Sequence, residues 1–160
     1  MNGDFAGARK VIEQLLARNP EDIGLQTELA ELHALDGDLE TAGAELERLQ
    51  AQHPTHSAVK RLAALLTFSD VVASHPDAVA LRSRAAANPG DLELQHALAV
   101  HQLLGGDFEP ALKTWLTLLR DHRNFRDDLA RHSLIQAFEL IGPADPIVAQ
   151  TRRAMTRLLF

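Results

Sequence analysis

The chain of 160 residues contains no cysteine and no tyrosine, and tryptophan occurs once. The missing cysteine excludes a disulfide scaffold, a thiolate metal site and a cysteine nucleophile within these residues. No apolar stretch approaches the roughly 20 residues that a membrane-spanning helix needs. The sequence begins without a charged segment followed by an apolar one, so it predicts no signal peptide. We therefore expect a cytoplasmic protein with no membrane partner.

Catalytic and cofactor motifs are missing as well. The sequence has no G-x-S-x-G, P-loop or dinucleotide-binding pattern. Its paired carboxylates, such as Glu28 with Glu31, stand beside no nucleophile or glycine-rich loop. We expect no enzyme activity and no cofactor, and keep a metal-dependent enzyme as the third hypothesis.

Histidine is the residue that invites a metal site, since there are eight of them. His53 and His56 are separated by Pro54, and His96 and His101 are five residues apart, about 140° around a helix. Neither pair has the spacing of ligands on one helical face. The sequence therefore predicts no metal site.

Charge is unevenly distributed. Residues 1–55 carry 11 acidic and 4 basic side chains, whereas the remaining residues carry 11 acidic and 12 basic ones. A nucleic-acid-binding protein would need a basic face. The charge pattern therefore predicts no nucleic-acid partner.

What the chain does contain is a repeat. Gly3-Asp4-Phe5 leads to Asn19-Pro20, and 34 residues later Gly37-Asp38-Leu39 leads to His53-Pro54; a third, weaker copy begins at Gly106-Asp107-Phe108. A fixed period of this length is the signature of stacked helical hairpins. With Ala and Leu abundant and apolar residues at helical spacing, the sequence predicts an all-α fold: antiparallel hairpins stacked as a short right-handed solenoid of about nine helices.

The positions of Gly, Pro and Asp, which favour turns and helix ends, set the boundaries that we expect for the repeats and helices. We predict one domain, 1–160, made of a partial repeat (1–20), a repeat (21–54), a degenerate repeat (55–88), a third repeat (89–123) and a C-terminal helix pair (124–160). Asp4 and Asp38 are expected to cap helices, and Gly37 to take the left-handed conformation. Pro76 is expected in the first turn of a helix, and the penultimate helix is expected over residues 126–141.

Two units carry a recognisable pattern. Gln26-x2-Leu29-Ala30-x2-His33 is followed by Ala42-x3-Leu46 and Pro54, and Gln95-x2-Leu98-Ala99-x2-Gln102 is followed by Ala111-x3-Trp115. Both resemble the tetratricopeptide repeat, W-x2-L-G-x2-Y, A-x3-F and P, with the first aromatic positions lost. The resemblance implies a non-catalytic module that binds proteins, and it places Trp115 in the core.

A narrower resemblance covers residues 88–160. The run Asn-Pro-Gly-Asp-Leu-Glu at 88–93, the helix end at 118–123, the segment 126–128 and the tail 152–160 are similar to the C-terminal repeats of bacterial thioredoxin-like co-chaperones (chaperedoxin type). The resemblance implies binding to unfolding clients, to the chaperonin, or to both. This chain lacks that family's thioredoxin domain and any C-x-x-C motif, so no redox role follows. The alternative is a generic repeat scaffold in another assembly, with no client-holding role.

The first helix of each hairpin would line the concave face of the stack. In this register the candidate binding residues are Thr27, Glu31 and Ala34, then His96, Val100, Leu103 and Leu104. They are not the Lys and Asn that grip acidic chaperone tails, and they suit an apolar or basic peptide better. The same residues also fit a second interpretation, in which they are core.

The C-terminal helix is the other candidate. Arg152, Arg153 and Arg157 occupy one side, and Leu158 and Phe160 contribute to an apolar side with Met155 and Leu159. Such a helix is expected to cap the stack, to dock into a partner, or to do both.

The phase of the repeat adds one expectation. Gly3 aligns with Gly37, so the chain opens at the turn within a hairpin. Phe5, Val11 and Leu15 then lack one neighbour. We expect either a fragment of a longer protein or a homodimer in which a second copy covers the incomplete N-terminal repeat.

Overall fold

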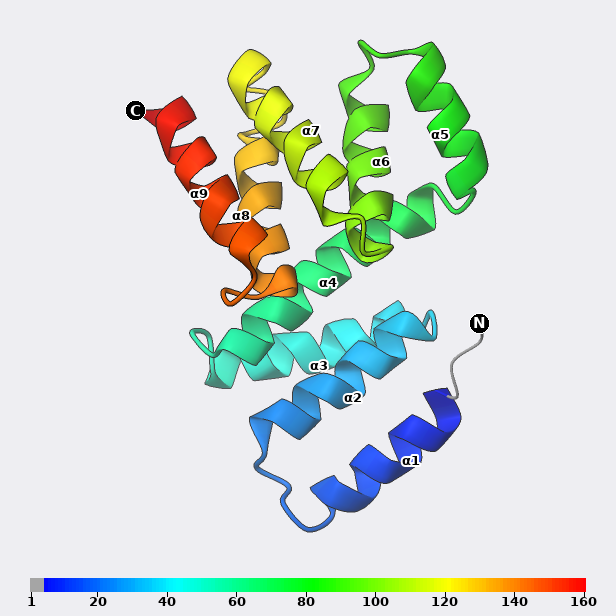
Figure 1. The fold of residues 1–160 in the computed structure, drawn as a ribbon. Coiled ribbons are helices and arrows are strands. Elements are labelled where there is room, and N and C mark those ends of the chain that lie inside the picture. The colour runs from blue at the N-terminus through cyan, green and yellow to red at the C-terminus, as the bar shows by residue number, and fades with distance from the viewer. Residues whose placement is uncertain (1–4) are drawn as a thin grey trace. The chain divides into compact units, whose positions relative to one another are not determined.

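The computed structural model describes residues 5–160, and within them it contains nine α-helices and no strand. The helices follow one another along the chain (Figure 1), with these bounds: α1 Phe5–Leu16, α2 Ile23–Leu35, α3 Leu39–Gln52, α4 Ser57–Ser74, α5 Ala78–Ala87, α6 Leu92–Leu104, α7 Phe108–Asp121, α8 Leu129–Ile141 and α9 Pro146–Leu159. The predicted all-α class of helical hairpins is confirmed. The expected cap at Asp4 and the turn at Gly3 lie outside the described residues.

The helices form two compact units, one ending at Ser69 and the other running from Asp70 to Phe160. In the first unit α1 packs on α2 and α2 on α3. In the second, α5 packs on α6, α6 on α7, and α7 on both α8 and α9. All of these contacts except that of α7 with α9 join helices that are consecutive in sequence, as short connections favour. The repeat boundaries drawn from the sequence stay a prediction.

The turns of the two best-formed hairpins have the same backbone geometry. Gly37 and Gly106 take φ values of +91° and +87°. After each glycine an aspartate N–H closes the turn: Asp38 donates to the carbonyl of His33 at 2.9 Å, and Asp107 donates to that of Gln102 at 2.8 Å. This six-to-one hydrogen bond across a left-handed residue is the Schellman ending of a helix. The predicted left-handed glycine is therefore present, and the same turn recurs 69 residues later.

Aspartates begin most of the helices, and one of them corrects an expectation. Asp38 accepts a hydrogen bond from the Thr41 N–H at 3.1 Å, as predicted. Asp77 accepts from the N–H groups of Val79 and Ala80 at 3.0 and 2.9 Å. Because Asp77 is the N-cap, α5 begins at residue 78 and Pro76 precedes the cap. The expectation that Pro76 lies in the first turn is wrong.

A second correction concerns the start of α8. The expected helix began at Arg126, but Arg126, Asp127 and Asp128 have φ values of +44°, +50° and +62°. Left-handed residues cannot continue a right-handed helix, so α8 begins only at Leu129. The Arg126 guanidinium pairs with Glu93 at 2.8 Å, which ties this loop to the first turn of α6. The segment contains no Gly or Pro, so the sequence does not indicate that these three residues are not helical.

Candidate protein-binding surfaces

The candidate residues on α2 are engaged within their own unit. Thr27 is buried, and its hydroxyl donates to the carbonyl oxygens of Ile23 and Gly24, which lie 3.0 and 2.8 Å away. Glu31 is half-buried, and its carboxylate pairs with Arg61 Nε at 3.1 Å. Ala34 is buried as well. Of the three, only Glu31 has a side chain that reaches solvent.

The candidate residues on α6 are also mostly interior. His96, Val100 and Leu103 are buried, whereas Leu104 is 40% exposed. The two candidate sets belong to different compact units. The helical register alone could not separate groove from core here, because α6 carries apolar residues around much of its circumference. Burial therefore fits the core interpretation for Thr27, Ala34, His96, Val100 and Leu103. Glu31 in the first unit and Leu104 in the second remain accessible.

His96 is a buried imidazole with a defined partner. The indole N–H of Trp115 donates to His96 Nδ1 at 3.1 Å, and the two ring centroids are 6.2 Å apart. Burial lowers the pKa of His96 from 6.5 to about 4, against the opposing effect of Glu93 and with help from Arg126 and His75. The imidazole is therefore neutral at pH 7 and keeps its proton on Nε2. Trp115 is fully buried, as the repeat pattern predicted.

No group of three or more His, Cys, Asp or Glu side chains among residues 5–160 could hold a metal ion. The His101 ring instead lies with Nε2 2.8 Å from the carbonyl oxygen of His75. The His75 ring lies with Nδ1 3.2 Å from the carbonyl of Val71. These two imidazoles tie the end of α4 and the loop that follows it to α6.

The C-terminal helix α9 has one side buried against its unit and another side exposed to solvent. Val148, Thr151 and Met155 are buried. The Arg152 guanidinium lies 4.8 Å above the Phe138 ring, a cation–π contact that covers one face of the ring. The remaining candidate residues are more open: Arg153, Arg157 and Phe160 are exposed and Leu158 is half-buried. The helix therefore packs on its unit and still presents charge and an aromatic ring to solvent.

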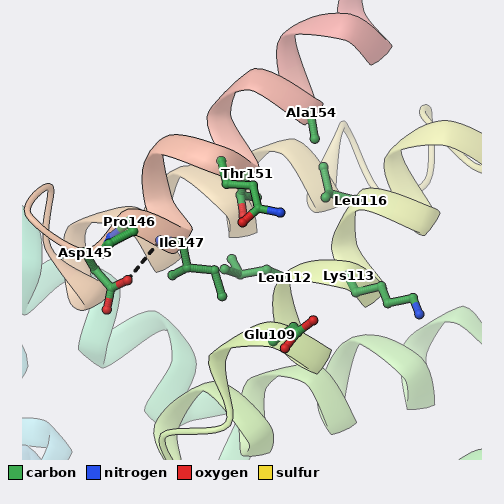
Figure 2. A pocket seen from close by; sticks show the side chains of 10 residues that line it. Glu109, Leu112, Lys113, Leu116, Asp145, Pro146, Ile147, Thr151 and Ala154 are labelled. Carbon is green, nitrogen blue, oxygen red and sulfur yellow. Dashed lines mark hydrogen bonds between the residues drawn. The ribbon is translucent and has the colours of Figure 1, made fainter.

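Sequence reasoning missed a groove between α7 and α9, in the second unit. Figure 2 shows side chains that line this groove. Its volume is about 510 Å³. Its lining residues are Glu109, Leu112, Lys113 and Leu116 from α7, and Asp145, Pro146, Ile147, Gln150, Thr151 and Ala154 from α9 and its cap. The signal in the sequence is two apolar series at helical spacing, Leu112 with Leu116 and Ile147 with Ala154. The same spacing is expected of residues that are fully buried in a core, so the sequence does not distinguish the two.

The polar side chains of the groove have few partners among residues 5–160. Glu109 and Lys113 are exposed and four residues apart, yet they form no ion pair with each other or with another described residue. The Asp145 carboxylate accepts the Ile147 N–H at 2.9 Å through one oxygen. Thr151 is only 5% exposed, and its hydroxyl makes no hydrogen bond to any residue in 5–160.

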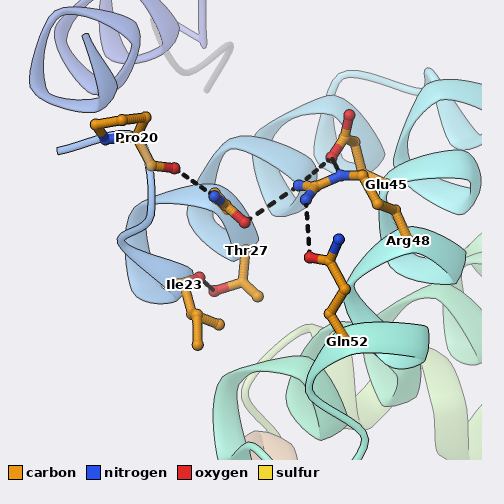
Figure 3. A network of polar contacts seen from close by, with 7 residues as sticks. Pro20, Ile23, Thr27, Glu45, Arg48 and Gln52 are labelled. Atoms are coloured by element: carbon orange, nitrogen blue, oxygen red, sulfur yellow. Dashed lines mark hydrogen bonds and ion pairs between the residues drawn. The ribbon is translucent and has the colours of Figure 1, made fainter.

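A second polar cluster, in the first unit, has a structural role (Figure 3). Arg48 binds the Glu45 carboxylate at 2.8 and 3.1 Å and the side-chain oxygen of Gln26 at 3.1 Å. The Gln26 amide in turn donates to the Pro20 carbonyl. In the other unit Gln95 donates in the same way to the Ala85 carbonyl at 3.0 Å. Glutamine thus takes the first aromatic position of the repeat pattern and ties each hairpin to the segment before it.

Comparison with family models agrees with this geometry. A model described as tetratricopeptide repeat matches residues 71–160, and another of the same description matches residues 1–66. The chain belongs to the tetratricopeptide repeat family. The sequence boundary between the two compact units, Ser69 to Asp70, falls between the two matches to this tetratricopeptide repeat protein. No curated protein and no solved structure matched it.

Tetratricopeptide repeats are generally non-catalytic protein–protein interaction modules. Within the described part of this tetratricopeptide repeat protein, no helix is long and apolar enough to cross a bilayer. Among the surfaces that could meet a protein partner are the α7–α9 groove and the exposed residues of α9.

Proposed function

We propose that this tetratricopeptide repeat protein is a non-catalytic binding module, the repeat region of a thioredoxin-like co-chaperone that binds unfolding clients, the chaperonin, or both. The observation that carries the binding role is the family match, which extends over 1–66 and 71–160. The co-chaperone assignment rests on the similarity of residues 88–160 to that family's C-terminal repeats.

Binding would be reversible and would use apolar side chains that the fold leaves accessible. Leu104, Ile135 and Phe160 are large apolar residues exposed by 40, 41 and 103%. Exposed apolar surface beside charged residues is typical of sites that hold protein segments. The exposed Arg153 and Arg157 of α9 are the charged residues that we expect to contact the chaperonin.

Light scattering of a thermally aggregating client tests the holding role. We expect the chain at equimolar concentration to delay and reduce aggregation, and to co-sediment with the chaperonin. An unchanged scattering curve together with no chaperonin binding would contradict the proposal. Recovery of one stoichiometric, non-chaperone partner instead would favour the generic scaffold.

A second copy of the chain is the other partner that we propose, at α1. No residue of α1 is buried, and Val11 and Leu15 are 57 and 42% exposed. Pairing of this amphipathic face with the same face of another copy would remove both side chains from water. Sedimentation velocity of the chain and of Leu15→Glu tests it: the wild type is expected to be dimeric and the variant monomeric. A monomeric wild type would refute it.

A further inference from the structure

We infer that the groove between α7 and α9 recognises a short segment of a partner protein in which a Lys or Arg stands next to large apolar residues. The inference rests on the proposed protein-binding function and names the chemistry that this groove would select. It concerns the surface formed by the second helices of successive hairpins, and none of the residues that line this groove was among the sequence-based site predictions.

The floor of the groove is apolar and comes from both helices. Leu112 is buried and Leu116 half-buried on α7, and Ile147 and Ala154 are half-buried on α9. In Figure 2 the side chains of Leu112 and Ile147 point toward one another across the groove. A Leu, Ile or Phe side chain placed here would lose its water-exposed area against four apolar neighbours.

Acidic groups stand where the two helices begin. Glu109 lies in the first turn of α7, and Asp145 is the N-cap of α9. Neither carboxylate has a cationic partner among residues 5–160. Two unpaired carboxylates at one end of an apolar groove attract a Lys or Arg side chain and repel an acidic one.

Lys113 does not neutralise this end. It follows Glu109 by one helical turn, and in Figure 2 its side chain points away from Asp145. It also lines a second, smaller hollow with Pro89, Leu92 and Thr117, so it stands on the ridge between the two. The acidic end of the groove is therefore open to a cation from a partner.

Polar groups along α9 suit the backbone of a bound segment. Thr151 is 95% buried, yet its hydroxyl has no hydrogen-bond partner in the described chain, and it lines the groove. The exposed Gln150 amide stands beside it. This hydroxyl is therefore free to pair with an N–H or C=O of a bound peptide. One bound peptide would thus bury an apolar side chain on the floor, pair a cation with the carboxylates and form a hydrogen bond with the Thr151 hydroxyl.

Two short peptides test the inference. The probes are acetyl-Arg-Ala-Leu-Leu-amide and acetyl-Glu-Ala-Leu-Leu-amide, titrated to millimolar concentration into the full chain with 13C-labelled Ile and Leu methyl groups. We expect the Arg peptide to shift the methyl signals of Leu112, Leu116 and Ile147, and the Glu peptide to bind about tenfold more weakly. Shifts confined to other residues, equal binding of the two peptides, or no shift with either would overturn the inference.

Charge reversal at the acidic end provides a matched pair of variants. Glu109→Lys is expected to weaken the Arg peptide about tenfold. Glu40→Lys is the control, because Glu40 is the first-turn acid at the same position of α3, 69 residues earlier. Both glutamates are exposed, so neither change disturbs a core. Equal affinity of the two variants would contradict the assignment.

A variant with a larger side chain on the floor of the groove distinguishes failure of this inference from failure of the proposed function. Ala154→Leu occupies the groove and is expected to abolish binding of both peptides. If Ala154→Leu and Glu109→Lys still suppress client aggregation as the wild type does, the groove is not the client site while the holding function stands. If the wild type binds the Arg peptide but never suppresses aggregation, the co-chaperone role fails while the groove assignment stands.

Discussion

The hairpins α2–α3 and α6–α7 have equal helix lengths and matching turns, but they fill their interiors differently. Each consists of a 13-residue and a 14-residue helix. The first buries five residues, and the second buries eleven. The buried residues of the first hairpin are Thr27, Ala30, Ala34, Ala42 and Leu49; those of the second are Leu94, His96, Ala97, Ala99, Val100, Leu103, Ala111, Leu112, Trp115, Leu118 and Leu119.

The difference lies in side-chain size at corresponding positions, 69 residues apart. Gly43 of α3 corresponds to Leu112 of α7, and the half-buried Leu46 corresponds to the fully buried Trp115. The repeat therefore specifies the backbone turn and the helix pairing, while the stability contributed by each hairpin depends on its own residues.

The variant Trp115→Ala is expected to have the largest effect on stability, and it tests the difference in packing between the two hairpins. The change leaves a cavity and removes the donor to His96, and we expect a loss of about 3–5 kcal/mol in the free energy of unfolding. Leu46→Ala, at the matching position, should cost only about 1–2 kcal/mol, since Leu46 is half-buried. Urea unfolding followed by circular dichroism measures both. Equal losses would mean that the hairpins are packed alike.

The next test uses pH. Because the pKa of His96 is about 4 in the folded chain and 6.5 when unfolded, the unfolded chain binds more protons between these values. The contribution of His96 is therefore complete above pH 6.5 and is lost as pH falls toward 4, a loss of about 3 kcal/mol.

The matched variant is His96→Thr, which installs the residue found at the corresponding position of α2, Thr27. We expect its unfolding free energy to fall less steeply than that of the wild type between pH 6.5 and 4, measured by urea unfolding at stepped pH. Parallel curves for the two proteins would show that burial does not depress the His96 pKa.

The smallest expected effect tests what the hairpins share. Gly37 and Gly106 have positive φ, so alanine at either position is strained although nothing lies within 4 Å of the added carbon. Each Gly→Ala change should cost about 1–2 kcal/mol. Gly43→Ala, in the interior of α3 and with equally open space, should instead stabilise by about 0.5–1 kcal/mol. If the losses of unfolding free energy in Gly37→Ala and Gly106→Ala differed markedly, the two turns would not be energetically equivalent.

Local signals predicted the number and class of the helices and the turns of the two best-formed hairpins. Gly37 and Gly106 marked turns, and Asp38 marked a cap, because each acts through its own backbone neighbourhood. The start of α8 could not be predicted this way. Arg126, Asp127 and Asp128 contain no helix breaker, and the ion pair of Arg126 with Glu93 joins residues 33 positions apart.

The binding surfaces were harder to predict than the helices. Val100 and Leu116 are both apolar residues at helical spacing, yet Val100 is fully buried and Leu116 lines an open groove. Which apolar positions stay accessible depends on how the helices pack, which helical periodicity does not report. The groove between α7 and α9 therefore emerged only from the three-dimensional arrangement.

The matching turns also bear on how such a chain changes length. The backbone leaves α2 and α6 through the same pair of closing hydrogen bonds, at Gly37 and Gly106. A deletion from residue 38 to residue 106 would lead α2 directly into α7 through an unchanged joint. Such a deletion removes the four helices α3 to α6. The two matching turns therefore make a pair of hairpins, rather than a single helix, the increment by which this protein can gain or lose residues without a change at the junction.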